Sequence, residues 1–338
     1  HHMKAVTIND IAKEAGVSKA TVSRVLNRPE SVEETTRKKV MGVIEKRRYS
    51  PSASARNLSR QTSSTVGVVV PEIDNPFFGE LLRGVSGILD KHNLTMICFN
   101  TDDLADKDGK ALQMVKDQRV IGLLYVPAID YDTSVQKKEI NHLIRELQAP
   151  IVIMDRNVES LKQYDGVFFD DRKGICEATE ILIEAGHRKI GIINATLERF
   201  LARIRLAGYQ DALKKHSIPF EEKYCYMGNY SMTRSYEISC EMLESDDCPT
   251  AVIACNNRSS MGFLKALRQH NLTLSDIACI GLDRIEALDI VGMDFNFIRR
   301  DARLLGETAV ETLIHRIAFP ADEIQKICLP HEIVIRKL

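Results

Sequence analysis

Hydrogen-bond donors gather on one side of a short helical segment near the start of the chain. The outward-facing residues are Lys19, Ala20, Thr21, Ser23 and Arg24. A guanidinium can bond O6 and N7 of one guanine together, and small neighbouring side chains let a helix enter the major groove. This set therefore predicts the reading of base edges in duplex DNA. An ordinary helical hairpin with a solvated basic face is the alternative that the pattern alone leaves open.

A second set of side chains stands directly after apolar runs of the chain. Its members are Asp74-Asn75-Pro76-Phe77-Phe78, Asp102-Asp103, Asp155-Arg156, Asn256-Asn257 and Asp283-Arg284. Carboxylates, amides and guanidinia supply directional hydrogen bonds, and flat aromatic rings pack on the C–H surface of a sugar or on a planar base. Each group alone is typical of an ordinary loop. Together they predict a site for a small molecule.

Two short helices must position the donors of the first set. Thr7 stands three residues before Asp10, which is typical of an N-cap followed by an acidic first turn. Gly16 falls where a tight turn between helices needs a left-handed residue, and Ser18 can cap the second helix. The segment 7–27 therefore predicts a helix-turn-helix.

A third helix and a polar connector follow. Apolar positions within 33–49 predict a helix that closes a small core, and Pro51 marks its end because the residue before proline is disfavoured in a helix. The segment 51–58, PSASARNL, is too short to form a stable helix by itself. We expect it to become ordered against a partner or against DNA, with a polar linker after it.

The net charge of −1 conceals an uneven distribution. Residues 1–60 carry 13 Lys and Arg against 6 Asp and Glu, a net charge of +7. The remainder carries 33 against 41, a net charge of −8. A basic head on an acidic body is typical of a polyanion-binding module joined to a domain with another task.

From Thr65 onward, apolar β-rich runs alternate with longer helical stretches. Runs such as 66–70 (VGVVV) and 151–154 (IVIM) are apolar at successive positions, which is typical of parallel strands covered by helices on both faces. The repetition of this unit predicts an α/β body of two doubly wound lobes. Ligands of such sheets bind beyond the carboxyl ends of the strands, where the second set of side chains stands.

Composition and motifs disfavour several classes of protein. The eight cysteines form no C-x-x-C pair and no His/Cys group with zinc-ligand spacing, so we expect no metal and no cofactor. The sequence has no secretory signal and no apolar run of membrane-spanning length, which favours a cytoplasmic protein without membrane contact. The adjacent carboxylates Asp102-Asp103 and Asp170-Asp171 would point to opposite faces of a strand. Since no G-x-S-x-G, Walker A or G-x-G-x-x-G motif is present either, we assign no catalytic residue.

Several motifs in the right order and spacing resemble the lactose-repressor/galactose-repressor (LacI/GalR) family of bacterial transcription regulators, over essentially the whole chain. The matching motifs are TINDIAKEAGVSKATVSRVLN at 7–27, YSPSASARNL at 49–58, VGVVVPEIDNPFF at 66–78, MDR at 154–156, EAGHRKIGII at 184–193, RLAGY at 205–209, GLD at 281–283 and LGETA at 305–309. No single motif would be specific, but their agreement is.

The resemblance implies an all-α, three-helix head with a hinge helix. It also implies a body of two lobes of periplasmic-binding-protein type, each a doubly wound parallel sheet, with three chain crossovers between them. We expect the head over 3–49 and the hinge helix with its linker over 50–64. The expected N-terminal lobe covers 65–163 with 296–322, and the C-terminal lobe covers 164–295 with 323–338.

For DNA, the resemblance places Lys19, Ala20 and Arg24 at base edges. Contacts to phosphates, which fix register without specifying sequence, are implied for Thr7, Ser18, Thr21, Ser23, Asn27 and Tyr49. In the hinge, Leu58 matches a leucine that the family uses as a minor-groove wedge, with Ala55 and Arg56 beside it. A hydrophobic contact inside the connector is the alternative for this leucine.

For the effector, the resemblance implies a pocket formed by Asn75, Phe77, Phe78, Asp155, Arg156, Arg205, Tyr230, Asn256, Asp283 and Arg300. Position 300 is frequently glutamine in the family, and the chain has Asn256-Asn257 where the family often has Asn-Asp. With Arg203 added, the site looks more cationic than a neutral sugar needs, which predicts an anionic effector such as a sugar phosphate. Arginines that bond loop carbonyls or lobe–lobe carboxylates are the competing interpretation.

The sequence thus predicts a homodimeric regulator, most simply a repressor, that binds a pseudo-palindromic double-stranded operator. A sugar or sugar phosphate between the lobes would control its operator affinity allosterically. Two alternatives stay open. One is the same architecture with a purine or nucleoside corepressor, and the other is a sugar-binding protein that does not regulate DNA.

Overall fold

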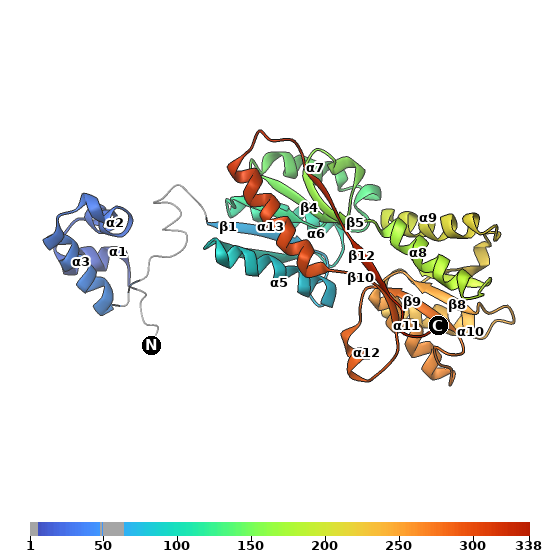
Figure 1. Ribbon diagram of the computed structural model, residues 1–338. Helices are drawn as coiled ribbons and strands as arrows, with labels where there is room; N and C mark the ends of the chain where they lie inside the picture. The colour runs from blue at the N-terminus through green and yellow to red at the C-terminus, as the bar shows by residue number, and fades with distance from the viewer. Residues whose placement is uncertain (1–5, 48, 50–63) are drawn as a thin grey trace. The chain divides into compact units, whose positions relative to one another are not determined.

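The computed structural model describes residues 6–47, 49 and 64–338. These residues form two compact units, one that ends at Ser64 and one over Thr65–Leu338, which we call the head and the body. The ribbon of each unit is drawn in Figure 1. The predicted hinge helix and linker, 50–64, lie outside the described residues except for Ser64.

The head is a bundle of three helices, as predicted: α1 (Ile8–Ala15), α2 (Lys19–Asn27) and α3 (Glu34–Arg47), with a 3-10 turn at Pro29–Ser31. Thr7 caps α1 and forms a reciprocal capping box with Asp10. Gly16 ends this helix with φ +63°, the left-handed conformation that a side chain would disfavour. The Oγ of Ser18 accepts the backbone N–H of Thr21 and so caps α2. The local signals read from the sequence are therefore confirmed.

One lobe of the body holds the first six-stranded parallel sheet, in the order β11-β5-β4-β3-β1-β2. Its helices cover both faces: α5 and α13 pack on one face and α6 and α7 on the other. The strands are β1 (Thr65–Val70), β2 (Thr95–Asn100), β3 (Gly122–Tyr125), β4 (Ile151–Asp155), β5 (Asp165–Phe169) and β11 (Lys326–Leu329). The helices are α5 (Pro76–Lys91), α6 (Ala105–Asp117), α7 (Lys137–Glu146) and α13 (Ala302–Ala318).

The other lobe holds the second sheet, in the order β12-β10-β9-β8-β6-β7, in which only β12 runs antiparallel. Here α8 and α9 pack on one face and α10 and α11 on the other. The strands are β6 (Ile190–Asn194), β7 (Cys225–Met227), β8 (Ala251–Ala254), β9 (Ala278–Leu282), β10 (Asn296–Arg300) and β12 (His331–Val334). The helices are α8 (Asp171–Glu184), α9 (Phe200–Lys215), α10 (Met232–Leu243), α11 (Asn257–Gln269) and α12 (Glu286–Ile290). The predicted α/β body of two doubly wound lobes is confirmed.

Three connections cross between the lobes, at Asp170, Asp301 and Pro330. The lobe boundaries expected from the sequence, 65–163 with 296–322 and 164–295 with 323–338, are wrong at these crossings. Strands β5 and β11 pair with each other in the N-terminal lobe, and β10 pairs with β9 in the C-terminal lobe. An apolar run reveals that a strand is buried, but only its pairing decides which sheet it joins. The observed lobes are therefore 65–169 with 302–329, and 171–300 with 331–338.

Close helix packing holds the N-terminal lobe together along α5 and α13. A Cβ added at Gly84 of α5 would stand 2.1 Å from the carbonyl oxygen of Arg303, whereas one at Gly87 of the same helix would meet nothing within 4 Å. Glycine at 84 therefore permits the contact between the two helices. None of the described helices is both long and apolar enough to cross a membrane.

Candidate functional site

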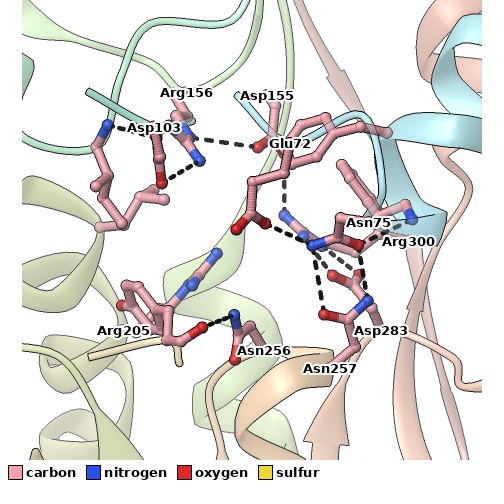
Figure 2. A pocket seen from close by; sticks show the side chains of 15 residues that line it. Glu72, Asn75, Asp103, Asp155, Arg156, Arg205, Asn256, Asn257, Asp283 and Arg300 are labelled. Atoms are coloured by element: carbon pink, nitrogen blue, oxygen red, sulfur yellow. Dashed lines mark hydrogen bonds and ion pairs between the residues drawn. The ribbon is translucent and has the colours of Figure 1, made fainter. Parts of the chain in front are cut away.

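A pocket lies between the two lobes, at the carboxyl ends of their strands (Figure 2). All ten residues predicted for the effector line it: Asn75, Phe77, Phe78, Asp155, Arg156, Arg205, Tyr230, Asn256, Asp283 and Arg300. Five further residues line it: Asp103 and Asn257, which belong to the second set of side chains found in the sequence, and Glu72, Ile129 and Leu201, which the sequence did not single out. Asp103 and Asn257 stand directly after strands, so their place in the sequence already carried a signal.

Arg300 is the centre of the pocket's electrostatics. This last residue of β10 bonds Asp283 with two nitrogens, at 2.8 and 2.7 Å. Its Nη1 also donates to Asp155 and to Asp171, at 3.1 Å each. The guanidinium lies 4.4 Å from the centre of the Phe77 ring. We call Arg300, Asp155, Asp171 and Asp283 the Arg300 cluster.

The Arg300 cluster joins the two lobes. Asp155 ends β4 of the N-terminal lobe, whereas Arg300, Asp171 and Asp283 belong to the C-terminal lobe. Two members stand beside chain crossings, since Asp171 follows Asp170 and Arg300 precedes Asp301. The hydrogen bond from Arg300 to Asp155 therefore spans the cleft next to the connections about which the lobes would move.

The other two arginines of the pocket are also paired. Arg205 donates Nε and Nη2 to Asp171, at 2.9 and 2.8 Å, and Nη1 to the carbonyl oxygen of Cys255. Its guanidinium lies 5.0 Å from the centre of the Tyr230 ring. Arg156 grips both carboxylate oxygens of Asp103 within the N-terminal lobe.

Burial and charge act in opposite directions on the carboxyl groups of the cluster. Burial raises the pKa of Asp155, although Arg300 opposes the shift. Burial also acts on Asp171, but the positive charges of Arg300 and Arg205 outweigh it and lower the pKa of that carboxyl. Burial would lower the pKa of Arg300, but the surrounding carboxylates hold it well above its ordinary value. The arginine is therefore charged at any pH at which the protein folds.

The expectation of a cationic cleft is wrong. Three arginines line the pocket with four carboxylates, and Asp171 beside them is a fifth. Arg203 donates to the carbonyl oxygens of Leu197 and Glu198. It therefore bonds loop carbonyls, as the alternative interpretation of these arginines expected. The sequence reveals the arginines but not their partners, because Asp103 and Asp171 come close to them only in the folded body.

A buried amide pair and a more exposed group of ion pairs also bridge the lobes. The side-chain amides of Asn75 and Asn257 face each other, with Nδ2 of Asn257 donating to Oδ1 of Asn75 at 2.9 Å. Arg258 lies 3.0 Å from Asp74 and 3.4 Å from Glu72. With the lobes held in this way, the free volume of the pocket is about 50 Å³. Sites for drug-sized ligands offer about 300–1,000 Å³, so the cleft is closed.

A buried carboxyl lies behind the wall of the pocket. Oδ2 of Asp108 accepts the hydroxyl of Tyr125 at 2.6 Å and the backbone N–H of Ala128 at 2.8 Å. Its Oδ1 has no hydrogen-bond partner within the described part of the chain. Burial raises the pKa of Asp108 to about 7. This carboxyl therefore changes its protonation near neutral pH.

The residues predicted to touch DNA lie where the head can present them, as far as the structure describes them. Lys19, Ala20 and Arg24 are exposed on α2, and neither Lys19 nor Arg24 forms an ion pair with any described residue. Among the predicted phosphate contacts, Thr7 and Ser18 are exposed, and Thr21, Ser23, Asn27 and Tyr49 are half-buried. The predicted hinge contacts Ala55, Arg56 and Leu58 lie outside the described residues.

Some predicted phosphate contacts already have internal partners. Oγ of Ser18 lies 2.9 Å from the hydroxyl of Thr21, and Nδ2 of Asn27 donates to Ser23 at 3.3 Å. A hydroxyl has one donor and two acceptor positions, so these bonds leave capacity for a phosphate oxygen.

Family models cover both units of the chain. Residues 7–52 match the family of bacterial regulatory proteins, lacI family, and residues 63–337 match the periplasmic binding proteins and sugar binding domain of LacI family. The HTH-type transcriptional repressor PurR of Aliivibrio salmonicida is 32% identical over 332 residues, which cover 98% of both chains. Catabolite control protein A of Priestia megaterium is 30% identical, with the same coverage.

Solved structures agree with these matches. The lac repressor dimer bound to operator and the anti-inducer ONPF has a TM-score of 0.82 and 25% identity, over 99% of both chains. A LacI family transcriptional regulator from Enterococcus faecium with bound ribose has a TM-score of 0.69 and 27% identity, over 80% of this chain and 96% of that one. The present chain belongs to the LacI family of bacterial regulatory proteins.

Proposed function

We propose that the chain is a cytoplasmic transcriptional repressor that binds a pseudo-palindromic operator as a homodimer. A small neutral molecule between the lobes of the body controls its operator affinity. The observation that carries this proposal is the joint presence, in one chain, of an exposed basic recognition helix and a two-lobed body with a polar cleft. The Aliivibrio salmonicida relative is a transcriptional repressor, and one neighbour is a repressor dimer bound to operator.

In the head, Arg24 is the residue that we expect to read a base. It is exposed on α2, and without an ion pair to any described residue it keeps its guanidinium available for O6 and N7 of a guanine. Lys19 and Ala20 of the same helix would approach neighbouring bases. The hydroxyls of Thr7, Ser18, Thr21 and Ser23, with Asn27 and Tyr49, would fix the register on phosphates.

The test of this assignment is an operator selected from random duplexes and titrated by fluorescence anisotropy. Arg24→Ala should lose about 1–3 kcal/mol of the discrimination between that operator and unrelated DNA. Lys38→Ala is the matched control, because Lys38 is exposed on α3 and pairs with Glu34. It should weaken binding to both duplexes equally. Unchanged discrimination in Arg24→Ala would refute the role given to this arginine.

In the body, the closed arrangement favours a neutral effector. Each pocket arginine is paired with a carboxylate, so an anionic ligand would find no free cation and would face the surplus carboxylates. Hydroxyls can instead bond to carboxylate oxygens, to amides and to the remaining guanidinium N–H groups. A neutral sugar fits this set of donors and acceptors, and the Enterococcus faecium neighbour contains bound ribose.

Calorimetric titration of paired ligands tests the effector class. We expect a neutral sugar to bind at least tenfold more tightly than its phosphate ester. A neutral nucleobase is included because a planar ring could stack on the aromatic wall formed by Phe77 and Phe78, whose rings meet edge to face at 5.2 Å. Tighter binding of the phosphate ester would refute the proposal of a neutral effector and would support an anionic effector.

A further inference from the structure

The cleft is closed by side chains of the protein itself. Arg300 reaches from the C-terminal lobe to Asp155 and packs against the Phe77 ring of the N-terminal lobe. The guanidinium thus occupies the place, between a carboxylate and an aromatic ring, in which a bound effector would form its contacts. An arginine is needed for this arrangement, because a glutamine at position 300 would have neither the charge nor the third nitrogen that reach three carboxylates at once.

We propose that Arg300 is an internal ligand of the cleft, which holds the lobes closed without effector and which an effector must displace from Asp155. The proposal rests on the proposed function only in taking this cleft as the effector site. An effector can then enter only after the bridge from Arg300 to Asp155 has opened.

Among the hydrogen bonds of Arg300, the one to Asp155 is the bond that a ligand could replace. Arg300 grips Asp283 with two parallel hydrogen bonds, and both residues belong to the C-terminal lobe, so this pair survives opening. Asp171 likewise stays with Arg205. Asp155 is held by Arg300 through one oxygen, while its other oxygen lies 3.8 Å from Nε of Arg156. A ligand hydroxyl can replace a single hydrogen bond, whereas it cannot replace a two-pronged ion pair.

The small volume of the pocket also supports displacement of Arg300 by an effector. A free volume of about 50 Å³ admits water but no monosaccharide, so the lobes must separate before an effector can enter. Breaking the contact to Asp155 leaves bridges that include Arg258–Asp74, Arg258–Glu72 and Asn257–Asn75 among the described residues. The pair at the surface is weak, since exposed ion pairs contribute little to stability.

Hydrogen–deuterium exchange of the full chain without effector tests the proposal. The reporters are peptides of the rim, 72–79 and 256–262, which contain neither Asp155 nor Arg300. Asp155→Asn keeps every contact of Arg300 within its own lobe but weakens the bridge. We expect exchange in the rim peptides to become at least tenfold faster. Arg300→Gln should do the same, and Arg300→Lys, which keeps the charge, should lie between Arg300→Gln and the wild type.

Arg299→Gln is the matched control. Arg299 is the preceding residue of β10, is exposed and lies 3.5 Å from Glu332, so its loss should leave rim exchange unchanged. A merely local role of Asp155 would accelerate exchange only around 151–158. That result, or wild-type exchange in the rim of both Asp155→Asn and Arg300→Lys, would overturn the proposal. Operator binding measured alongside separates the two claims, because a wild-type chain that fails to bind operator would refute the proposed function and leave the internal ligand standing.

Discussion

Replacing Arg300 by glutamine should destabilise the body strongly, and more at pH 7 than at pH 5. With Arg205, the Arg300 cluster contains two guanidinia and three carboxylates, so its net charge is −1 in the wild type and −2 in the variant. Removing one partner of a buried ion pair costs about 3–5 kcal/mol, and the side chain of Arg300 is only 5% exposed. We therefore expect a loss of about 4 kcal/mol in the free energy of unfolding at pH 7.

The pH dependence follows from the direction of the shifts. In Arg300→Gln, burial of Asp155 is no longer opposed by its main counter-ion, so the folded-state pKa of this carboxyl rises further above its unfolded value. The folded variant then binds a proton more strongly than the unfolded chain, and part of the lost stability returns as the pH falls from 7 to 5. In the wild type, the lowered pKa of Asp171 gives stability that is present above about pH 4 and lost below it.

Urea titration followed by far-UV circular dichroism, at pH 7 and pH 5 and at one protein concentration, measures both effects. Arg299→Gln serves as the control and should change the free energy of unfolding by about 0–1 kcal/mol, because its pair with Glu332 is exposed. Equal stability of Arg300→Gln and Arg299→Gln would refute the argument from burial. A loss that is the same at both pH values would refute the argument from the carboxylates.

Three further predictions concern stability elsewhere in the chain. Asp108→Asn should flatten the decline in stability between pH 4 and 7. With a folded-state pKa of about 7, Asp108 keeps its proton in the folded wild type while the unfolded chain loses it, which lowers the free energy of unfolding by up to about 4 kcal/mol across that range; urea titrations that show the same decline in both proteins would refute this assignment. Gly84→Ala should lose about 1–3 kcal/mol through the clash with α13, whereas Gly87→Ala should gain about 0.5–1 kcal/mol from helix propensity, and thermal melts that rank the two the other way would contradict the packing. Ser18→Ala should destabilise α2 by about 1 kcal/mol, and unchanged amide exchange over 19–27 would show that its cap contributes nothing.

Structural features that depend only on neighbouring residues, such as the ends of the head helices, were predictable from the sequence. Thr7, Gly16 and Ser18 mark the ends of the head helices because capping and left-handed turns depend on a few neighbouring residues. The polar residues after the strands were predictable as a group, since the carboxyl ends of parallel strands meet at one edge. The ten residues that the family resemblance implied for the effector all line one pocket at that edge.

What the sequence did not reveal depends on contacts between distant segments. Asp103 and Arg156 are 53 residues apart, and Asp171 and Arg300 are 129 apart, so no local pattern shows that these charges neutralise each other. The charge of the cleft was misjudged for that reason. The assignment of β5, β10 and β11 to the wrong lobes has the same origin, because strand pairing is decided across the sheet and not along the chain.

The central claim is that the cleft of the body controls the head. Its most direct test is the operator affinity of the full chain, measured by anisotropy with and without a cleft ligand identified by thermal shift. Linkage requires that the ligand change operator affinity by the same factor by which operator changes ligand affinity in calorimetry. We predict a change of at least fivefold, equal in the two titrations. A ligand that binds the cleft and leaves operator affinity unchanged would contradict the account.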